Sequence, residues 1–164
     1  MLWLFTDPVR LPDPRAAVAA LPRGLCGVVF RHDDPALAQD LARICRARRN
    51  ALVIAGNWRL AATFKAGEHL RRGHGPARAR LVTSSAHTAM EVRRARRAGA
   101  ALIFLSPVFA TASHPTAKGL GVVRWAALAR GGNVAALGGI DGRSIQRLPR
   151  VCAAIGAIGA LAVG

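Results

Sequence analysis

Short apolar runs alternate with amphipathic stretches along most of this chain. Residues 101–105 are five consecutive apolar positions bounded by turn residues, which is typical of a strand buried on both faces. Shorter runs of the same kind recur at regular intervals. The pattern predicts eight strands, at residues 2–5, 27–30, 51–55, 68–70, 81–84, 101–105, 134–137 and 157–163, of which 68–70 is the weakest.

Capping signals predict helices between these strands. The pairs Asp13-Pro14 and Asp34-Pro35 each combine an N-cap with a first-turn proline, and Leu37, Leu41, Ile44 and Cys45 then share one helical face. Further signals are Asn57 as the cap of a helix that Gly67 ends, the capping box of Thr88 and Glu91, a helix after residues 101–121, and Asp141 before a short helix with Ile145 and Leu148 facing inward. Residues 71–80 are expected to be a loop with at most one helical turn.

Eight strands that alternate with helices indicate a parallel sheet, and eight units favour closure into a (β/α)8 TIM barrel. A doubly wound open sheet is the alternative. The 164 residues suit one domain, 1–164, which is shorter than the roughly 200 to 250 residues usual for such barrels. No helix is predicted after the eighth strand, so we expect an abbreviated outer ring that a homo-oligomer could cover.

Charge and cysteine content narrow the classes of partner. The formal charge of +16, from 24 basic and 8 acidic residues, favours anionic partners, in particular phosphorylated small molecules. The arginines are spread over predicted helix faces without interleaved aromatic residues, so nucleic acid is expected to bind only nonspecifically. Three widely spaced cysteines predict buried thiols and a cytoplasmic protein, and no apolar run is long enough to predict a membrane span.

Candidate chemistry gathers where the predicted strands end, because the carboxyl ends of barrel strands form the usual site. Glycines after strands seven and eight would let backbone N–H groups approach a phosphate, although two adjacent glycines also suit a tight turn. The polar candidates can equally serve as caps or turn residues. The candidates are Arg31, Asn57, Ser85, His87, Thr111, Ser113 and His114, with Gly138, Gly139 and Gly164 as the glycines.

The segment SPVFATASHPTAKGLG, residues 106–121, resembles the GPVFPT-x-(T/S)-K segment of the thiamine phosphate synthase/TenI superfamily. The likeness extends over almost the whole chain, through LFTDP near the start, SSAH, ALGGI and the final GAIGALAVG. It implies a (β/α)8 barrel. It also implies a thiamine biosynthesis transferase that joins hydroxymethylpyrimidine diphosphate to thiazole phosphate and releases diphosphate, with Mg²⁺ on the leaving group.

The resemblance assigns roles to the candidate residues. Gly138, Gly139 and Gly164 fall where the family binds the thiazole phosphate, with His87 nearby as a further substrate contact. Thr111 and Ser113 match hydroxyls that hold diphosphate. Arg31, Ser85 and His114 are the expected catalytic residues.

Several positions differ from the family pattern. Val29 replaces a glutamine, and His114 replaces a lysine. Asn57 and His74 stand at the expected Mg²⁺-ligand positions, although hard cations prefer carboxylate oxygen. Pro107 replaces the histidine of the thiazole tautomerase branch. Two hypotheses follow, a thiamine phosphate synthase and a degenerate TenI-like protein that binds thiazole phosphate without synthase activity; a nucleic-acid-binding module, based on charge alone, is a third.

Overall fold

Eight parallel strands close into a barrel in the computed structural model, which describes residues 1–75, 77–111 and 119–158. Each strand pairs with the next along the chain, and the last pairs with the first, Leu2 lying opposite Ile155. The TIM barrel prediction is therefore confirmed, and the open sheet is excluded. The strands are β1 (Leu2–Phe5), β2 (Cys26–Phe30), β3 (Ala51–Ala55), β4 (Gly67–Leu70), β5 (Val82–Ala86), β6 (Leu102–Leu105), β7 (Val134–Leu137) and β8 (Ala154–Ala157).

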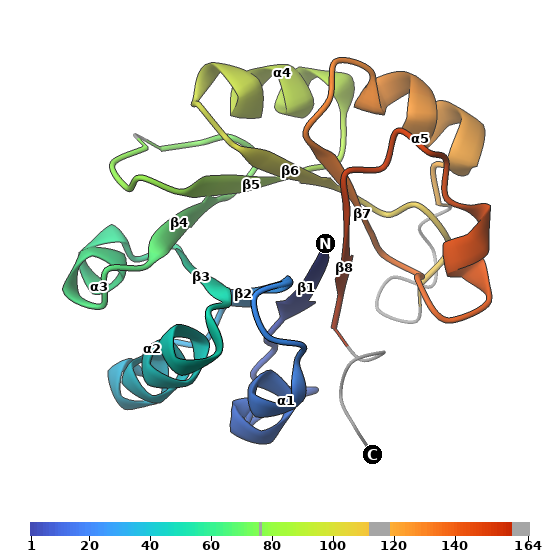
Figure 1. Ribbon diagram of the computed structural model, residues 1–164. Helices are drawn as coiled ribbons and strands as arrows, with labels where there is room; N and C mark the ends of the chain where they lie inside the picture. Colours follow the sequence, from blue (N-terminus) through green and yellow to red (C-terminus); the bar gives the residue numbers. More distant parts are fainter. Residues whose placement is uncertain (76, 112–118, 159–164) are drawn as a thin grey trace.

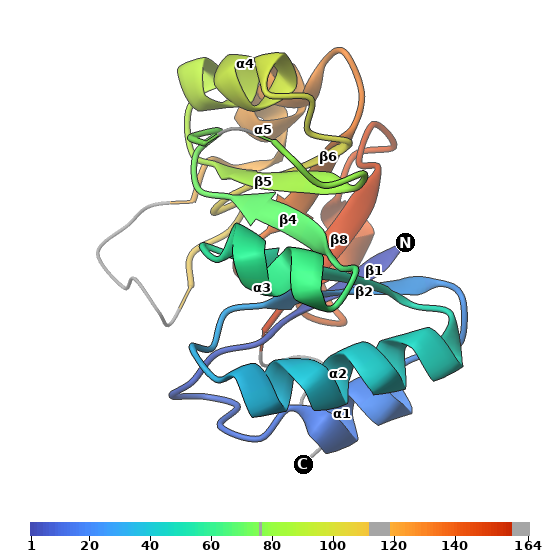
Figure 2. The ribbon, with the colours of Figure 1, turned by 90° about the vertical axis from the view of Figure 1, so that its left-hand side faces the viewer.

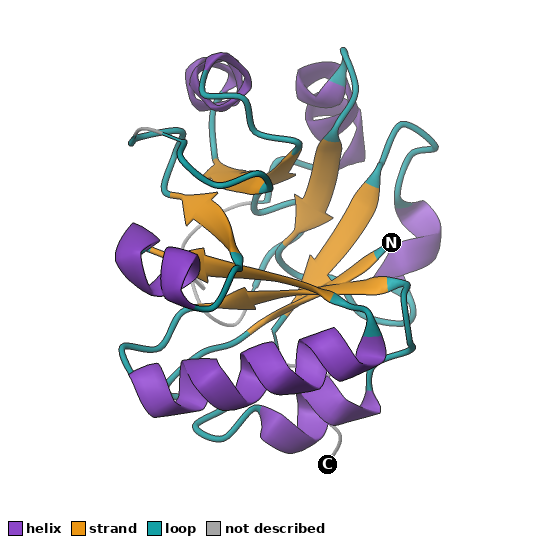
Figure 3. Ribbon diagram, turned by 60° about the vertical axis from the view of Figure 1, so that its left-hand side comes forward, coloured by secondary structure: helices purple, strands orange, loops and turns teal. Residues whose placement is uncertain are grey.

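Helices surround the strands on the outside, as the purple and orange segments of Figure 3 show. The helices are α1 (Arg15–Ala20), α2 (Pro35–Arg48), α3 (Trp58–Thr63), α4 (Ala89–Arg97) and α5 (Val122–Ala129). Figure 2 shows α1 and α2 side by side under the strands, with α4 and α5 on the opposite side of the barrel. None of the helices in the described residues is both long and apolar enough to cross a bilayer.

Most predicted caps are present, which explains where these helices begin. The Asp34 side chain accepts hydrogen bonds from the N–H groups of Ala36 and Leu37. The Thr88 hydroxyl accepts one from the N–H of Glu91, whose own carboxylate accepts from the N–H of His87 rather than from that of the cap residue. Asp13 lies one residue farther from α1 than predicted, because Pro14 takes the N-cap position.

Gly67 does not end α3, as predicted, but begins β4. The helix stops at Thr63, and Lys65, with a φ of 53°, reverses the chain into the strand. A side chain at position 67 would meet the Leu81 carbonyl oxygen at 2.5 Å. Glycine is thus needed here for close packing of β4 against the start of β5.

The outer ring has no helix between β4 and β5 among the described residues (Figure 1). The described part of residues 71–80 is a loop, as predicted, and has no helical turn, because Arg72, Gly73 and Gly75 all have positive φ angles that interrupt a right-handed helix. The segment is held instead by the Arg78 N–H, which donates to the Glu68 carboxylate, and by the Arg78 guanidinium over the Trp58 ring.

The last third of the chain departs most from prediction. A 3₁₀-helix, η1 (Ser144–Arg147), follows β7, and Ile145 is 39% exposed rather than facing inward, while Leu148 packs against the core. Strand β8 occupies residues 154–157, three residues before the predicted start. Ile155 pairs with both Leu2 and Ala136. Pairing with β1 on one side and β7 on the other therefore decides which part of the long apolar run forms the strand.

Aromatic side chains fill the centre of the barrel. Phe104 makes edge-to-face contacts with Trp3 and Phe5, at ring-centroid distances of 5.5 and 4.8 Å. Glycines provide the space: a side chain at Gly27 would overlap the Trp3 ring, and one at Gly156 would lie 2.9 Å from Phe5. The clusters between the strands and the helices are mainly aliphatic. All three cysteines are free; Cys26 and Cys45 are buried and Cys152 is half-buried.

Candidate active site

The carboxyl ends of the eight strands meet at one end of the barrel, which we call the mouth. Side chains alternate between the inside and the outside of a strand, so Arg31 and Ser85 continue the inward-facing rows of β2 and β5. Both positions lie where the sequence analysis placed them. The mouth therefore brings together polar groups from strands that are far apart in sequence.

Arg31 is bound closely by the loop after β1. Its Nε donates to the Thr6 carbonyl at 2.7 Å, and its Nη2 donates to the Asp7 carboxylate at 2.8 Å. Burial lowers the pKa of Arg31, and the charge of Asp7 opposes this effect. The guanidinium stays protonated, and its Nη1 makes no hydrogen bond within the described residues, so one terminal nitrogen remains for an anion.

Asp7 is a carboxylate at the mouth that the sequence analysis did not select as a site residue. Burial acts to raise the pKa of Asp7, but the hydrogen bonds from the N–H groups of Arg10 and Val9, together with the charge of Arg31, outweigh burial and lower the pKa below its usual value. Asp7 is therefore ionised at neutral pH. The available signal was its place directly after the first strand; its pairing with Arg31, 24 residues away, depends on the register of β1 and β2.

His87 and Ser106 connect the ends of β5 and β6. The Nδ1 of His87 lies 2.9 Å from the Ser106 carbonyl oxygen and 3.2 Å from its hydroxyl. If Nδ1 carries the proton and donates to the carbonyl, Nε2 is free to accept. The Ser85 hydroxyl, at the end of β5, accepts a hydrogen bond from the N–H of Arg72 at 3.2 Å. Two hydroxyls and an imidazole thus lie at adjacent strand ends.

His69 lies inside the barrel below the mouth, and the sequence analysis missed it. Its Nδ1 is 2.8 Å from the Thr83 hydroxyl, and its ring contacts Phe5 and Phe104. Burial, with a smaller contribution from Arg31, lowers the pKa of His69 to about 3. The residue is therefore a neutral hydrogen-bonding group. The signal for it was a polar residue at an inward position of a short buried strand.

Gly138 and Gly139 lie against the loop that follows β6. Their φ angles are 92° and 67°. A Cβ at Gly138 would lie 2.9 Å from Pro107 and 3.3 Å from the Thr111 methyl group, and one at Gly139 would lie 2.5 Å from the Ala110 carbonyl oxygen. These glycines are thus required for the close approach of two segments, which the family resemblance assigns to the diphosphate and to the thiazole phosphate.

Of the two residues whose hydroxyls the resemblance assigns to diphosphate, Thr111 and Ser113, the structure describes Thr111. Its hydroxyl oxygen is buried and has no hydrogen-bond partner in the described part of the chain. Ser113, His114 and Gly164 lie outside the described residues. Strand β8, which the prediction placed at residues 157–163, ends at Ala157.

The residues at the expected metal positions do not fit Mg²⁺. The side-chain amide oxygen of Asn57 caps α3 by accepting a hydrogen bond from the Leu60 N–H at 3.0 Å. His74 binds Arg94 through its Nε2. No group of three or more His, Cys, Asp or Glu side chains that could hold a metal occurs among residues 1–75, 77–111 and 119–158.

Comparisons with known proteins agree with this architecture. A family profile described as thiamine monophosphate synthase matches residues 14–160. Among solved structures, a thiamine phosphate pyrophosphorylase from Pyrococcus furiosus has a TM-score of 0.80 at 18% identity, covering 97% of this chain and 85% of its own. A cube-shaped, highly porous protein cage designed by fusing symmetric oligomeric domains has a TM-score of 0.50 at 17% identity, with coverages of 97% and 63%. No curated protein sequence matches.

Proposed function

Because this chain belongs to the thiamine monophosphate synthase family, we propose that it joins hydroxymethylpyrimidine diphosphate to thiazole phosphate at the mouth of the barrel. The observation that carries the proposal is the contact between the Thr111 loop and the Gly138-Gly139 turn. The resemblance assigns these segments to diphosphate and to thiazole phosphate, and two substrates that react with each other must bind side by side.

The reaction breaks the bond between the pyrimidine methylene carbon and a diphosphate oxygen. Diphosphate leaves with the electron pair, and the thiazole nitrogen donates its lone pair to form the new carbon–nitrogen bond. In our proposal, Arg31 and the hydroxyl of Thr111 stabilise the charge that develops on the departing diphosphate. The N–H groups of Gly138 and Gly139 hold the thiazole phosphate, with Ser85 and His87 lining the space between.

Mg²⁺ has no part in this proposal, because Asn57 and His74 are engaged within the chain and neither is a carboxylate. Positively charged side chains would carry the electrostatic stabilisation instead. Asp7, the aspartate directly after β1, is bound to Arg31 and to two backbone N–H groups.

A second candidate function is binding of thiazole phosphate without synthesis. The observation in its favour is that two donors of Arg31 are already used by Thr6 and Asp7, which leaves less of the guanidinium for a leaving group. The glycine turn does not depend on Arg31, so a phosphate could bind there alone.

Incubating the full chain with both substrates, with and without Mg²⁺, tests the first candidate. Thiamine phosphate that forms in the wild type and is strongly reduced in Arg31→Ala supports the synthase. Binding of thiazole phosphate by calorimetry with no product, in protein shown to be folded by circular dichroism, supports the second candidate. Absence of both product and binding refutes the two together.

A further inference from the structure

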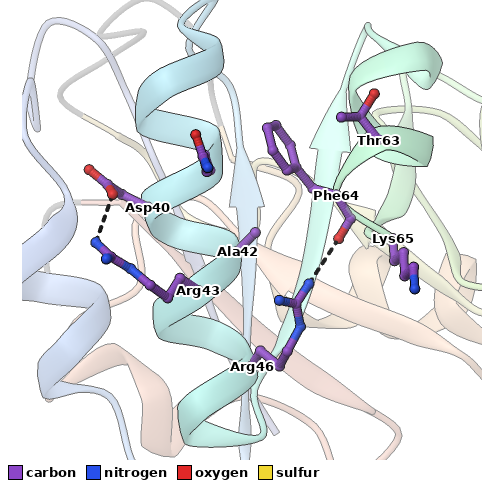
Figure 4. A pocket seen from close by; sticks show the side chains of 8 residues that line it. Asp40, Ala42, Arg43, Arg46, Thr63, Phe64 and Lys65 are labelled. Carbon is purple, nitrogen blue, oxygen red and sulfur yellow. Dashed lines mark hydrogen bonds and ion pairs between the residues drawn. The ribbon is translucent and has the colours of Figure 1, made fainter.

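A groove lies between α2 and α3 on the outside of the barrel. It consists of two cavities of about 780 and 540 Å³, both lined by Ala42, Arg46, Phe64 and Lys65. Figure 4 shows the outer cavity, with Asp40, Arg43 and Arg46 on α2 and Thr63, Phe64 and Lys65 at the end of α3. The inner cavity reaches the starts of β3 and β4 at Ala51 and Gly67, so this α2–α3 groove opens toward the end of the barrel opposite the mouth.

The inner part of the groove carries unpaired positive charge. The one carboxylate in the outer part, Asp40, is bound by Arg43 at 2.9 Å and by Arg15 at 2.8 Å. Arg46 reaches the Phe64 carbonyl at 3.5 Å, and in the described part of the chain neither it nor Lys65 or Arg80 forms an ion pair. Among the described residues, no acidic side chain lines the inner cavity. Three cations thus surround one apolar space.

Asn50 provides an independent sign of a missing partner. It lines the inner cavity and is only 8% exposed, yet neither its amide nitrogen nor its amide oxygen has a hydrogen-bond partner within the described residues. A buried amide left unpaired costs about 1–3 kcal/mol. A ligand that supplied an acceptor to this amide would remove part of that cost.

We propose that the α2–α3 groove is a second binding site, for a small molecule that carries a phosphate or carboxylate on an apolar body. The anion would lie among Arg46, Lys65 and Arg80, where charge-assisted hydrogen bonds are strong. The apolar body would lie on Leu52, Phe64 and Leu81, which line the same cavity. The volume is within the range of small-molecule sites, about 300–1,000 Å³. The site is separate from the mouth and does not depend on the reaction proposed there.

Nuclear magnetic resonance of the isotope-labelled full chain can test the site, with phenyl phosphate as the probe at constant ionic strength. We expect saturable shifts of the backbone amides of Asn50, Ala66 and Gly67. Shifts of Gly138 and Gly139 report separately on any binding at the mouth. Benzoate tests whether a carboxylate replaces phosphate, and benzyl alcohol, which has no charge, should not bind.

Two substitutions should weaken groove binding without unfolding the protein. Lys65→Gly removes a cation at a position where the φ of 53° suits glycine. Asn50→Leu replaces the unpaired amide with an apolar side chain of similar size. Each is expected to reduce affinity about tenfold, the effect of one lost charge-assisted or buried hydrogen bond. Arg93→Ala on α4, outside the groove, is the matched basic-to-neutral control and should leave the affinity unchanged.

The proposal is overturned if residues 50, 66 and 67 show no saturable shift up to about 10 mM phenyl phosphate, a concentration well above that of a weak specific site. It is also overturned if the shifts persist unchanged in both Lys65→Gly and Asn50→Leu. Loss of groove shifts in these variants with the Gly138 and Gly139 shifts retained supports it.

Discussion

Replacing Gly139 by alanine tests two reasons for a glycine at this position of the mouth, its positive φ and the lack of space for a side chain. The residue has a φ of 67°, and an added Cβ would lie 2.5 Å from the Ala110 carbonyl oxygen and 2.8 Å from the Phe109 Cβ. The left-handed backbone alone costs an alanine about 1–2 kcal/mol, offset by roughly 0.4–1 kcal/mol from the stiffer unfolded chain. Displacing the packed loop adds about 1–3 kcal/mol. We therefore expect the free energy of unfolding to fall by about 2–4 kcal/mol.

Gly132→Ala is the matched control for this experiment. Gly132 has a φ of 79°, but nothing lies within 4 Å of its added Cβ. It should lose about 1 kcal/mol, the backbone effect alone. Urea unfolding of both variants measures the difference. Equal losses for Gly139→Ala and Gly132→Ala would refute the conclusion that Gly139 is required for approach of the loop. A displaced loop should also weaken thiazole phosphate binding in Gly139→Ala and leave it intact in Gly132→Ala.

Three further predictions concern charge and packing. The pKa of His69 is lowered from 6.5 to about 3, so the folded state binds fewer protons than the unfolded state, and its free energy of unfolding falls as the pH drops from about 6.5 to 3. At pH 5 the loss should be about 2 kcal/mol. Urea unfolding measured against pH should show this loss in the wild type and not in His69→Phe. Asp7→Asn should release Arg31 and so raise the affinity for pyrophosphate several-fold, which calorimetry would measure; an unchanged affinity would contradict this. The free energy of unfolding should change by less than about 1 kcal/mol, because the Arg31–Asp7 pair is partly exposed. Trp58→Ala removes the ring on which Arg78 stacks and should lower the free energy of unfolding by about 1–2 kcal/mol, as measured with urea. Trp58→Phe keeps an aromatic ring and should lower it by less.

Two predictions about partners, one from the net charge and one from the short outer ring, stay open. Nonspecific binding of nucleic acid follows from the +16 charge, and strong weakening by added salt would support it. An oligomer that covers the open part of the outer ring also stays a prediction, and sedimentation of the full chain would test it.

Local sequence determined which elements form and where most of them begin. A side chain that caps a helix acts within three residues, as Asp34, Asn57 and Thr88 do, so no distant partner is needed to recognise it. The alternation of apolar runs with predicted helices was sufficient for a parallel sheet and favoured a barrel, but the pairing of β8 with β1 decided between a barrel and an open sheet. The mouth followed from the same order, because every parallel strand delivers its carboxyl end to one side.

The tertiary structure decided the register, the pairing and the packing. The run that ends the chain is apolar throughout, and only pairing with β1 and β7 places β8 at residues 154–157. The bond between Asp7 and Arg31 and the position of His69 beside Thr83 likewise depend on neighbouring strands. Such contacts join residues that are distant in sequence, and their geometry exists only once the barrel is closed. For the same reason, sequence could propose Gly138 as a phosphate ligand but could not show that Pro107 and Thr111 pack against it.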